Sequence, residues 1–323
     1  MLQENFSQLI QNKKKAYAFA VILAMLVILP VFAMAGRGRD VYVDTKANGT
    51  QDGSKSHPYK TIKQAADRAG KRTKIHVANG TYRENIELKD GVNLYGHDKD
   101  SVIIDAKSDD KATVVMKDDT RIDNVTIKNG KYGIKIADDE EASITECIIK
   151  DNDEDGIHIE NAGLKKSTTV TISKNEINEN GRAGIYSEKR KLTIIDNEIA
   201  NNESNGIDLE KSANAWIANN EIKGNSGSGM KLRIDGSNIW TKNNTFRNND
   251  HEGLEVYFSG AYGRINVAKA DFIKNERNGV ARIQDFAISV NSEGLWNKYL
   301  TFENNNTFSQ NKKADIAGVI IKK

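Results

Sequence analysis

The sequence has little of several residue types, and each shortage excludes a class of protein. Among its 323 residues there is one cysteine, Cys147, so no intramolecular disulfide, thiolate zinc cluster or redox pair can form. Two prolines are too few for a proline-rich linker, and 28% charged residues are too many for a multi-pass membrane protein. The fold must therefore be held together by packing and hydrogen bonds.

A charge excess of either sign is also missing, since 47 lysines and arginines face 45 aspartates and glutamates. Residues 1–35 hold three of the basic and one of the acidic residues, so the rest of the chain has 44 of each sign. This balance gives no indication of a nucleic-acid partner. Any binding of a polyanion must be local.

The first 35 residues have the composition of a targeting segment. Lys13, Lys14 and Lys15 precede an apolar run, and the small residues Ala33 and Ala35 follow it. This order predicts a secretory signal peptide. Residues 16–35 taken whole are also long enough for an N-terminal membrane anchor, and that alternative stays open. In both cases we expect residues 36–323 to be exported, that is, secreted, periplasmic or at the cell surface, with membrane contact only through this segment.

An Asn-x-x-x-Gly repeat, followed each time by an aliphatic residue, runs through the chain. Its copies are Asn129/Gly133, Asn152/Gly156, Asn180/Gly184, Asn202/Gly206, Asn225/Gly229, Asn249/Gly253 and Asn275/Gly279, and Asn311 begins an eighth without the glycine. The first seven asparagines lie 22 to 28 residues apart, which is the spacing of a solenoid. A second asparagine column precedes the repeat asparagine by five residues, at Asn175, Asn197, Asn220, Asn244 and Asn306.

Apolar residues alternate with polar ones inside each repeat, as in Ile157-His158-Ile159. Period two with β-branched residues predicts short strands, and helical spacing is absent. Leucine-rich, ankyrin and tetratricopeptide repeats are excluded because each needs a helix or fixed leucines. We predict stacked coils of about 23 residues with two or three strands each. The asparagine columns should then form ladders inside the turns, and the glycines should permit the turn into the next strand.

The ends of such a stack need caps. Residues 61–69 read as a short amphipathic helix that would cover the first coil. We predict one domain over residues 36–323, with the N-terminal cap and first coils at 36–100. The repeat coils would span residues 101–283, and a C-terminal coil and cap residues 284–323.

These residues resemble the right-handed parallel β-helix, or pectate-lyase-like, superfamily. The likeness rests on the repeats and on a segment that contains Val41–Asp44, Pro58–Ile62 and Gly80–Glu84, where the chain is similar to the family's N-terminal coil, helix and G-T-Y-x-E turn. The resemblance implies an all-β, right-handed parallel β-helix solenoid with a short N-terminal capping helix. For activity it is weaker, because the superfamily includes lyases, hydrolases, epimerases and non-catalytic surface proteins.

Candidate site residues form two outward columns, two and four residues after each repeat glycine. They read Lys135, His158, Tyr186, Asp208, Lys231, Glu255, Ala281 and Ala137, Glu160, Glu188, Glu210, Arg233, Tyr257, Ile283. Removing the proton beside a uronate carboxylate needs a base and a cation that stabilises the developing charge. We therefore predict Lys231, Arg233 and Tyr257 as catalytic residues. The predicted substrate-binding residues are His158, Tyr186, Asp208, Glu210 and Glu255.

Other interpretations of the columns stay open. Asp208, Lys231 and Glu255 could be cross-strand ion pairs of an ordinary exposed sheet. Asp208 and Glu255 would lie about 10 Å apart, near the upper limit for inverting hydrolysis. No metal motif is present, although Ca²⁺ held by Glu210 and Glu255 could supply the cation. The acidic segments 138–141 and 151–155 lack calcium-loop spacing, so we expect solvated loops.

The sequence as a whole predicts an exported, monomeric β-helix protein that acts on or binds extracellular or envelope polysaccharide. One hypothesis is a uronate polysaccharide lyase or related enzyme, supported by Lys231, Arg233 and Tyr257. The alternative is a non-catalytic glycan-binding, surface-structural or adhesion protein. It is supported by the neutral chain after residue 35 and by two absences, of the Asp-Pro-His motif of the alginate epimerases and of a cluster of three aspartates of the polygalacturonase type.

Overall fold

The computed structural model describes residues 38–137, 139–161, 168–258, 262–285, 292–303 and 305–322. The chain divides into the units Met1–Arg39 and Asp40–Lys323, and the following description concerns the second. The predicted signal or anchor segment, residues 1–35, lies outside the described residues. Within the described ranges, no helix has the length and apolar character needed to cross a membrane.

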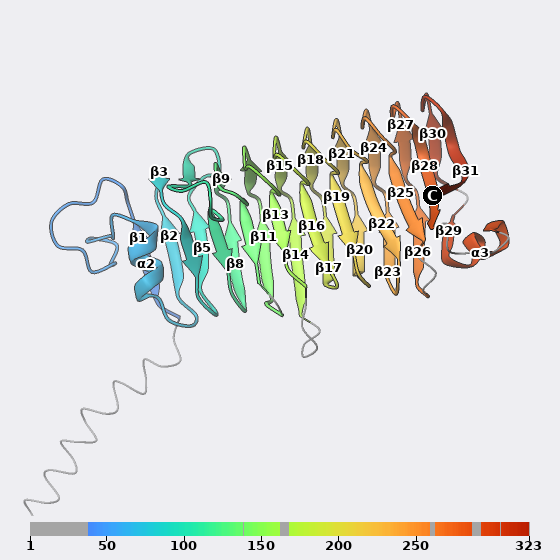
Figure 1. Ribbon diagram of the computed structural model, residues 1–323. Coiled ribbons are helices and arrows are strands. Elements are labelled where there is room, and N and C mark those ends of the chain that lie inside the picture. The colour runs from blue at the N-terminus through green and yellow to red at the C-terminus, as the bar shows by residue number, and fades with distance from the viewer. Residues whose placement is uncertain are drawn as a thin grey trace, which may run out of the picture. The chain divides into compact units, whose positions relative to one another are not determined.

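The second unit is a stack of coils built from three parallel sheets (Figure 1). β1 pairs with β2, and from β2 onward each strand pairs with the strand three further along the chain. Sheet A contains β1 (Asp40–Val43), β2 (Lys74–Val77), β5 (Asn93–Gly96), β8 (Thr120–Asp123), β11 (Ala142–Thr145), β14 (Thr169–Ser173), β17 (Lys191–Ile195), β20 (Asn214–Ala218), β23 (Asn238–Lys242), β26 (Arg264–Ala268) and β29 (Leu300–Phe302). Sheet B contains β3 (Gly80–Arg83), β6 (Val102–Asp105), β9 (Thr126–Lys128), β12 (Ile148–Lys150), β15 (Glu176–Asn178), β18 (Glu198–Ala200), β21 (Glu221–Lys223), β24 (Thr245–Arg247), β27 (Asp271–Ile273) and β30 (Thr307–Ser309). Sheet C contains β4 (Ile86–Leu88), β7 (Val114–Met116), β10 (Ile134–Ile136), β13 (Ile157–Ile159), β16 (Ile185–Glu188), β19 (Ile207–Glu210), β22 (Met230–Ile234), β25 (Leu254–Phe258), β28 (Asn278–Asp285) and β31 (Ala314–Lys322).

The alternation of apolar and polar residues places one aliphatic row of each sheet inside the stack. In sheet C, Ile134 pairs with Ile157, which pairs with Ile185, and all three are fully buried. Fully burying such a side chain is worth about 2 kcal/mol, so the core gains with every added coil. The predicted all-β solenoid is confirmed.

The predicted asparagine ladders are present in two turns of the coil. In the longer ladder each side-chain amide donates from Nδ2 to Oδ1 of the asparagine in the next coil, at 2.8 to 3.0 Å. Its members are Asn152, Asn180, Asn202, Asn225, Asn249, Asn275 and Asn311. The shorter ladder joins Asn175, Asn197, Asn220 and Asn244 in the same way. These bonds satisfy polar groups that burial would otherwise leave unpaired at about 1–3 kcal/mol each.

The prediction is wrong for the first repeat asparagine, Asn129, which does not join the ladder. Asn129 has φ of 62° and donates to the Asp105 carboxylate at 2.7 Å, outside the ladder. Gly130 takes the ladder position instead, since its N–H donates to Asn152 Oδ1 at 3.1 Å. A glycine has no side chain to extend the ladder, so the ladder of side-chain amides begins at Asn152.

The repeat positions require glycine for a different reason from the one predicted. A Cβ on Gly156 would lie 2.7 Å from Asn180 Nδ2 and 2.8 Å from the carbonyl oxygen of Gly184, so the neighbouring coil leaves no room for a side chain. The left-handed backbone falls on the residue before each ladder asparagine, for example Asp151 at 53° and Lys174 at 58°.

The predicted N-terminal helix is α2 (Ile62–Arg68), which buries Ile62, Ala65 and Ala66 against the first coils. The side chain of Thr61 caps it, and the carboxylate of Glu84 accepts the N–H groups of Ile62 and Lys63 at 3.0 and 2.7 Å. Both contacts satisfy donors that a helix start leaves free. Beyond Ile283 the chain forms α3 (Ser292–Tyr299) and a further coil of β29, β30 and β31.

Candidate functional site

The two predicted columns lie on the outer face of sheet C. Strand pairing places Lys135 beside His158, and His158 beside Tyr186. The same column continues through Asp208, Lys231 and Glu255. Asp208 differs from expectation, because only 8% of the residue is exposed.

Three aromatic rings stack across successive coils of this face. The centroids of Tyr132 and His158 are 4.3 Å apart, those of His158 and Tyr186 are 5.3 Å apart, and the ring planes differ by 25° and 17°. The His158 ring is therefore covered on both faces and presents its edge. We call Tyr132, His158 and Tyr186 the sheet C stack. Tyr132 was not predicted, because it stands in the turn before β10, one residue before Gly133.

A buried carboxylate lies behind the histidine. Asp155 Oδ2 is 2.8 Å from Nδ1 of His158, and Asp155 Oδ1 accepts the N–H of Ala183 at 3.1 Å. The expectation of a solvated loop is wrong for Asp155, which is 0% exposed. A carboxylate at Nδ1 fixes the proton on that nitrogen and leaves Nε2 as the acceptor of the neutral ring.

The two tyrosines of the stack are proton donors. Burial, together with the nearby charge of Glu154, raises the pKa of Tyr132 to about 12. Burial also raises the pKa of Tyr186, and its hydroxyl donates to Glu188 Oε1 at 2.6 Å. Both phenols therefore keep their protons at neutral pH and can serve as hydrogen-bond donors.

The predicted catalytic residues come together further along the face. Lys231 Nζ lies 3.3 Å from Asp208 Oδ2 and 3.9 Å from Glu210 Oε1, while Arg233 Nη2 lies 2.6 Å from the same Glu210 oxygen. The Arg233 guanidinium also lies over the Tyr257 ring, 5.1 Å from its centroid. Burial raises the pKa of Asp208, against the opposing charge of Lys231. In this arrangement Lys231 is an ion-paired cation, which suits charge stabilisation better than proton abstraction.

The two carboxylates considered as calcium ligands have other partners. Glu210 contacts Lys231 and Arg233, and Glu255 accepts a hydrogen bond from Ser228 Oγ at 3.0 Å. Two cations beside Glu210 already balance its charge, so this geometry does not favour Ca²⁺ there. Across the described part of the chain, no group of three or more histidine, cysteine, aspartate or glutamate side chains is placed to hold a metal ion.

A basic groove continues the face from the sheet C stack toward α2. It has a volume of about 480 Å³, and Tyr132 and Lys135 line it together with Lys63, Lys111 and Lys131. Glu87 and Asp110 are its acidic lining residues. Lys63 comes from a helix and Lys111 and Lys131 come from turns, so no strand periodicity could assign them to one face. We call this feature the lysine groove.

Comparison with known proteins agrees with the fold. Residues 90–165 and 162–292 match the family described as "Right handed beta helix region", and residues 45–102 match a family described as "Protein of unknown function (DUF1565)". No curated protein sequence matches the chain.

Solved structures with the same architecture include three with similar coverage. Pectate lyase Pel9A has 13% identity and a TM-score of 0.55 over 88% of this chain and 78% of its own. XylC in complex with xylose has 12% identity and a TM-score of 0.59 over 76% and 69%. A variant of the periplasmic alginate epimerase AlgG has 13% identity and a TM-score of 0.53 over 78% and 69%. At these identities the likeness concerns the fold alone.

Proposed function

This chain belongs to the right handed beta helix family, and we propose that it binds an acidic polysaccharide along the outer face of sheet C. A polymer that follows the axis of the stack meets one strand about every 4.8 Å, so the columns give it repeated contacts. Known proteins of similar fold include a pectate lyase and an alginate epimerase, which supports a polysaccharide as the ligand class.

The lysine groove beside the sheet C stack carries this proposal. Lys63, Lys111, Lys131 and Lys135 line one groove with two carboxylates. Lys63, Lys131 and Lys135 also form ion pairs with Asp67, Glu154 and Glu160 at 3.1, 3.5 and 2.7 Å, so an acidic polymer would compete with these carboxylates for the lysines. Clustered positive charge in a groove attracts an anionic ligand. The phenol of Tyr132 at the end of this groove donates its proton to Glu154, and its oxygen can accept a hydrogen bond from a sugar hydroxyl.

The predicted residues further along the face would contact other units of the same polymer. Lys231 lies four strands beyond Lys135, a distance of about 19 Å, so an oligosaccharide can reach both. In this proposal Arg233 and Lys231 offset a second carboxylate, and Tyr257 packs beside it. The acceptors for hydroxyl groups are Tyr186, Asp208, Glu210 and Glu255.

Binding is tested with the purified protein and a panel of acidic and neutral polysaccharides, by co-sedimentation and calorimetry. The informative variant is Lys111→Ala/Lys131→Ala, and its matched control is Lys191→Ala/Lys242→Ala, which removes two exposed lysines of sheet A. We expect the first double variant to bind acidic polymers about 5- to 10-fold more weakly than the unmutated protein, and the control to bind them with unchanged affinity. Equal affinity for neutral polymers, or equal loss in the control, would contradict the proposal.

A second function, proton abstraction at His158, is favoured by the buried Asp155. With Nδ1 held by Asp155, Nε2 can take the proton beside a uronate carboxylate. Lys135, the neighbour of His158 in sheet C, can offset the developing charge. The electron pair of the broken C–H bond then either expels the glycosidic oxygen, which leaves an unsaturated unit, or takes a proton back on the other face.

The two outcomes are followed together, as unsaturated product and as deuterium taken up from heavy water. Either signal from the unmutated protein supports an enzyme. Retained binding with neither signal would support the non-catalytic glycan-binding protein that is the alternative to an enzyme.

Export is also a proposal, and it rests on residues 1–35. We expect the mature chain to be recovered outside the cytoplasm, either without the segment or attached to the membrane by it. The mass of the recovered chain distinguishes these two cases. Recovery of the intact chain in the cytoplasm would contradict export.

A further inference from the structure

A second stack of the same residue types lies at the N-terminal end of sheet A. Tyr42, His76 and Tyr95 occupy paired positions of β1, β2 and β5. Their centroids are 5.1 and 6.0 Å apart, with ring planes that differ by 22° and 25°. His76 Nε2 lies 2.7 Å from Asp40 Oδ1. We call these three rings the sheet A stack.

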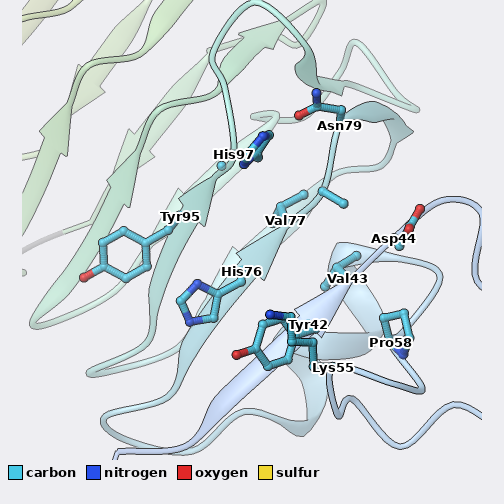
Figure 2. A pocket seen from close by; sticks show the side chains of 12 residues that line it. Tyr42, Val43, Asp44, Lys55, Pro58, His76, Val77, Asn79, Tyr95 and His97 are labelled. Atoms are coloured by element: carbon cyan, nitrogen blue, oxygen red, sulfur yellow. The ribbon is translucent and has the colours of Figure 1, made fainter.

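A hollow of about 650 Å³ opens beside this stack. Two residues beyond each ring, the outward positions of the three strands are Asp44, Ala78 and His97. The small side chain of Ala78 between two larger ones leaves the space. Figure 2 shows His76 and Tyr95 on one side of it, and Asp44, Asn79 and His97 around the other. We call it the Ala78 hollow.

The polar groups around the hollow differ in kind from those of the lysine groove. One carboxylate, Asp44, and one ammonium, Lys55, line it, together with the amide of Asn79 and the imidazole of His97. Asp44 Oδ1 accepts the N–H of Lys46 at 2.8 Å. Within the described residues, the side chains of Asn79 and His97 make no hydrogen bond, so their donors and acceptors are available to a ligand.

We propose that the Ala78 hollow binds one unit of a neutral sugar. Its volume is in the range of small-ligand sites, which combine apolar walls with a few polar groups. Pro58 and the rings of Tyr42 and Tyr95 supply apolar lining, while the carboxylate, amide and imidazole can pair with several hydroxyl groups of one sugar ring. Because Asp44 and Lys55 balance each other's charge, the hollow does not favour an anionic sugar over a neutral one. The hollow lies on sheet A, so this inference does not depend on the activity proposed for sheet C.

The experiment titrates the full-length protein with neutral mono- and disaccharides and, separately, with uronate oligosaccharides, followed by ligand-observed NMR and calorimetry. Ala78→Leu fills the hollow, and Asn79→Ala removes one polar group from its exposed rim. We expect millimolar binding of a neutral sugar by the unmutated protein, its loss in Ala78→Leu, and about a fivefold weakening in Asn79→Ala. The lysine groove pair Lys111→Ala/Lys131→Ala should bind the neutral sugar as the unmutated protein does.

Circular dichroism of each variant establishes that the coils are intact. Since Asn79 is exposed, its variant tests the site even if Ala78→Leu disturbs the strand. Absence of neutral-sugar binding by the unmutated protein overturns the inference, as does binding that both variants retain. A uronate that binds at the hollow more tightly than any neutral sugar overturns the ligand class. Loss of acidic-polymer binding in the lysine variants reports on sheet C alone.

Discussion

The two stacks contain the same residue types in different surroundings. Each has a tyrosine, a histidine and a tyrosine in successive coils, and an aspartate follows in register, Asp208 after Tyr186 and Asp123 after Tyr95. In sheet C the histidine contacts Asp155, which is 0% exposed, whereas in sheet A it contacts Asp40, whose side chain is 55% exposed. Water and salt screen the second contact but hardly reach the first.

This difference shows that a row of rings does not by itself define a catalytic group. The His158 side chain is 16% exposed, and Asp155 holds its Nδ1 from behind. The outward edge of the neutral ring therefore presents Nε2 as a hydrogen-bond acceptor. The His76 side chain is 39% exposed and its partner lies on the surface. We therefore place the proposed proton transfer on sheet C and the proposed binding of a neutral sugar, without chemistry, on sheet A.

The largest expected effect comes from removing the histidine of the sheet C stack. His158→Ala should lower the rate of solvent deuterium uptake into a uronate polymer by about 100-fold or more, because a general base contributes that much. The same change in the sheet A stack, His76→Ala, should weaken the binding of the neutral sugar at the Ala78 hollow. His251→Ala, far from both stacks in sequence, controls for the loss of a surface imidazole. Equal rates in His158→Ala and the unmutated protein would refute the role of His158.

The next effect compares the two carboxylates. Asp155→Asn should lower the free energy of unfolding by about 2 kcal/mol, since it removes a buried hydrogen bond to a charged group. Asp40→Asn, at a surface contact, should change it by about 0.5 kcal/mol or less. Urea midpoints of the two variants measure the difference. Equal midpoints would mean that burial of the partner does not distinguish the stacks.

A smaller effect concerns ionic strength. Binding of an acidic polymer at the lysine groove should weaken several-fold as salt rises, because the Debye length falls from about 30 Å at 0.01 M to about 8 Å at 0.15 M. Binding of a neutral sugar at the Ala78 hollow should not change with salt. Calorimetry at the two salt concentrations compares the sites, and parallel salt dependence would indicate one shared site.

The smallest effect concerns the aspartates that follow the stacks. Burial raises the pKa of Asp208 above its usual 3.8, so the charged form destabilises the folded state above that raised pKa. The penalty fades as the pH falls through the raised pKa toward 3.8, because both states then hold the proton. Asp208→Asn should therefore be slightly more stable than the unmutated protein at pH 7, and this gain should disappear in acid. Asp123→Asn, which breaks a contact with Arg121 at 2.5 Å, should show no such gain.

Most of the fold could be predicted from the sequence because the repeat is local and regular. The constant distance from Asn180 to Gly184, and from Asn202 to Gly206, indicated the coil, the ladder and the outward columns, and the structure contains all three. The spacing could not show why the glycine is there, since the nearest atoms belong to the next coil. It also could not detect the shorter turn that moves Asn129 out of the ladder.

Less of the candidate site could be predicted, because its parts come from turns. Asp155 looked like one more charge in an acidic loop, and only the fold places it behind His158. A weak signal existed, an aspartate three residues before a histidine at a strand start. Tyr132 and Lys111 lie in turns that no period describes. The roles of Lys231, Arg233 and Tyr257 stay a prediction.

The asparagine ladders also determine where this protein can grow. In the coils with both ladders, the two asparagines are five residues apart, as in Asn175 and Asn180 or Asn244 and Asn249. The remaining part of a coil, which runs through sheet C to the next strand of sheet A, varies in length. In these coils the length therefore varies beside the face that we assign to the polymer, while the segment between the two ladder asparagines keeps its length. A lineage could lengthen the rim of its binding face, and so change its ligand, without altering the stacked frame.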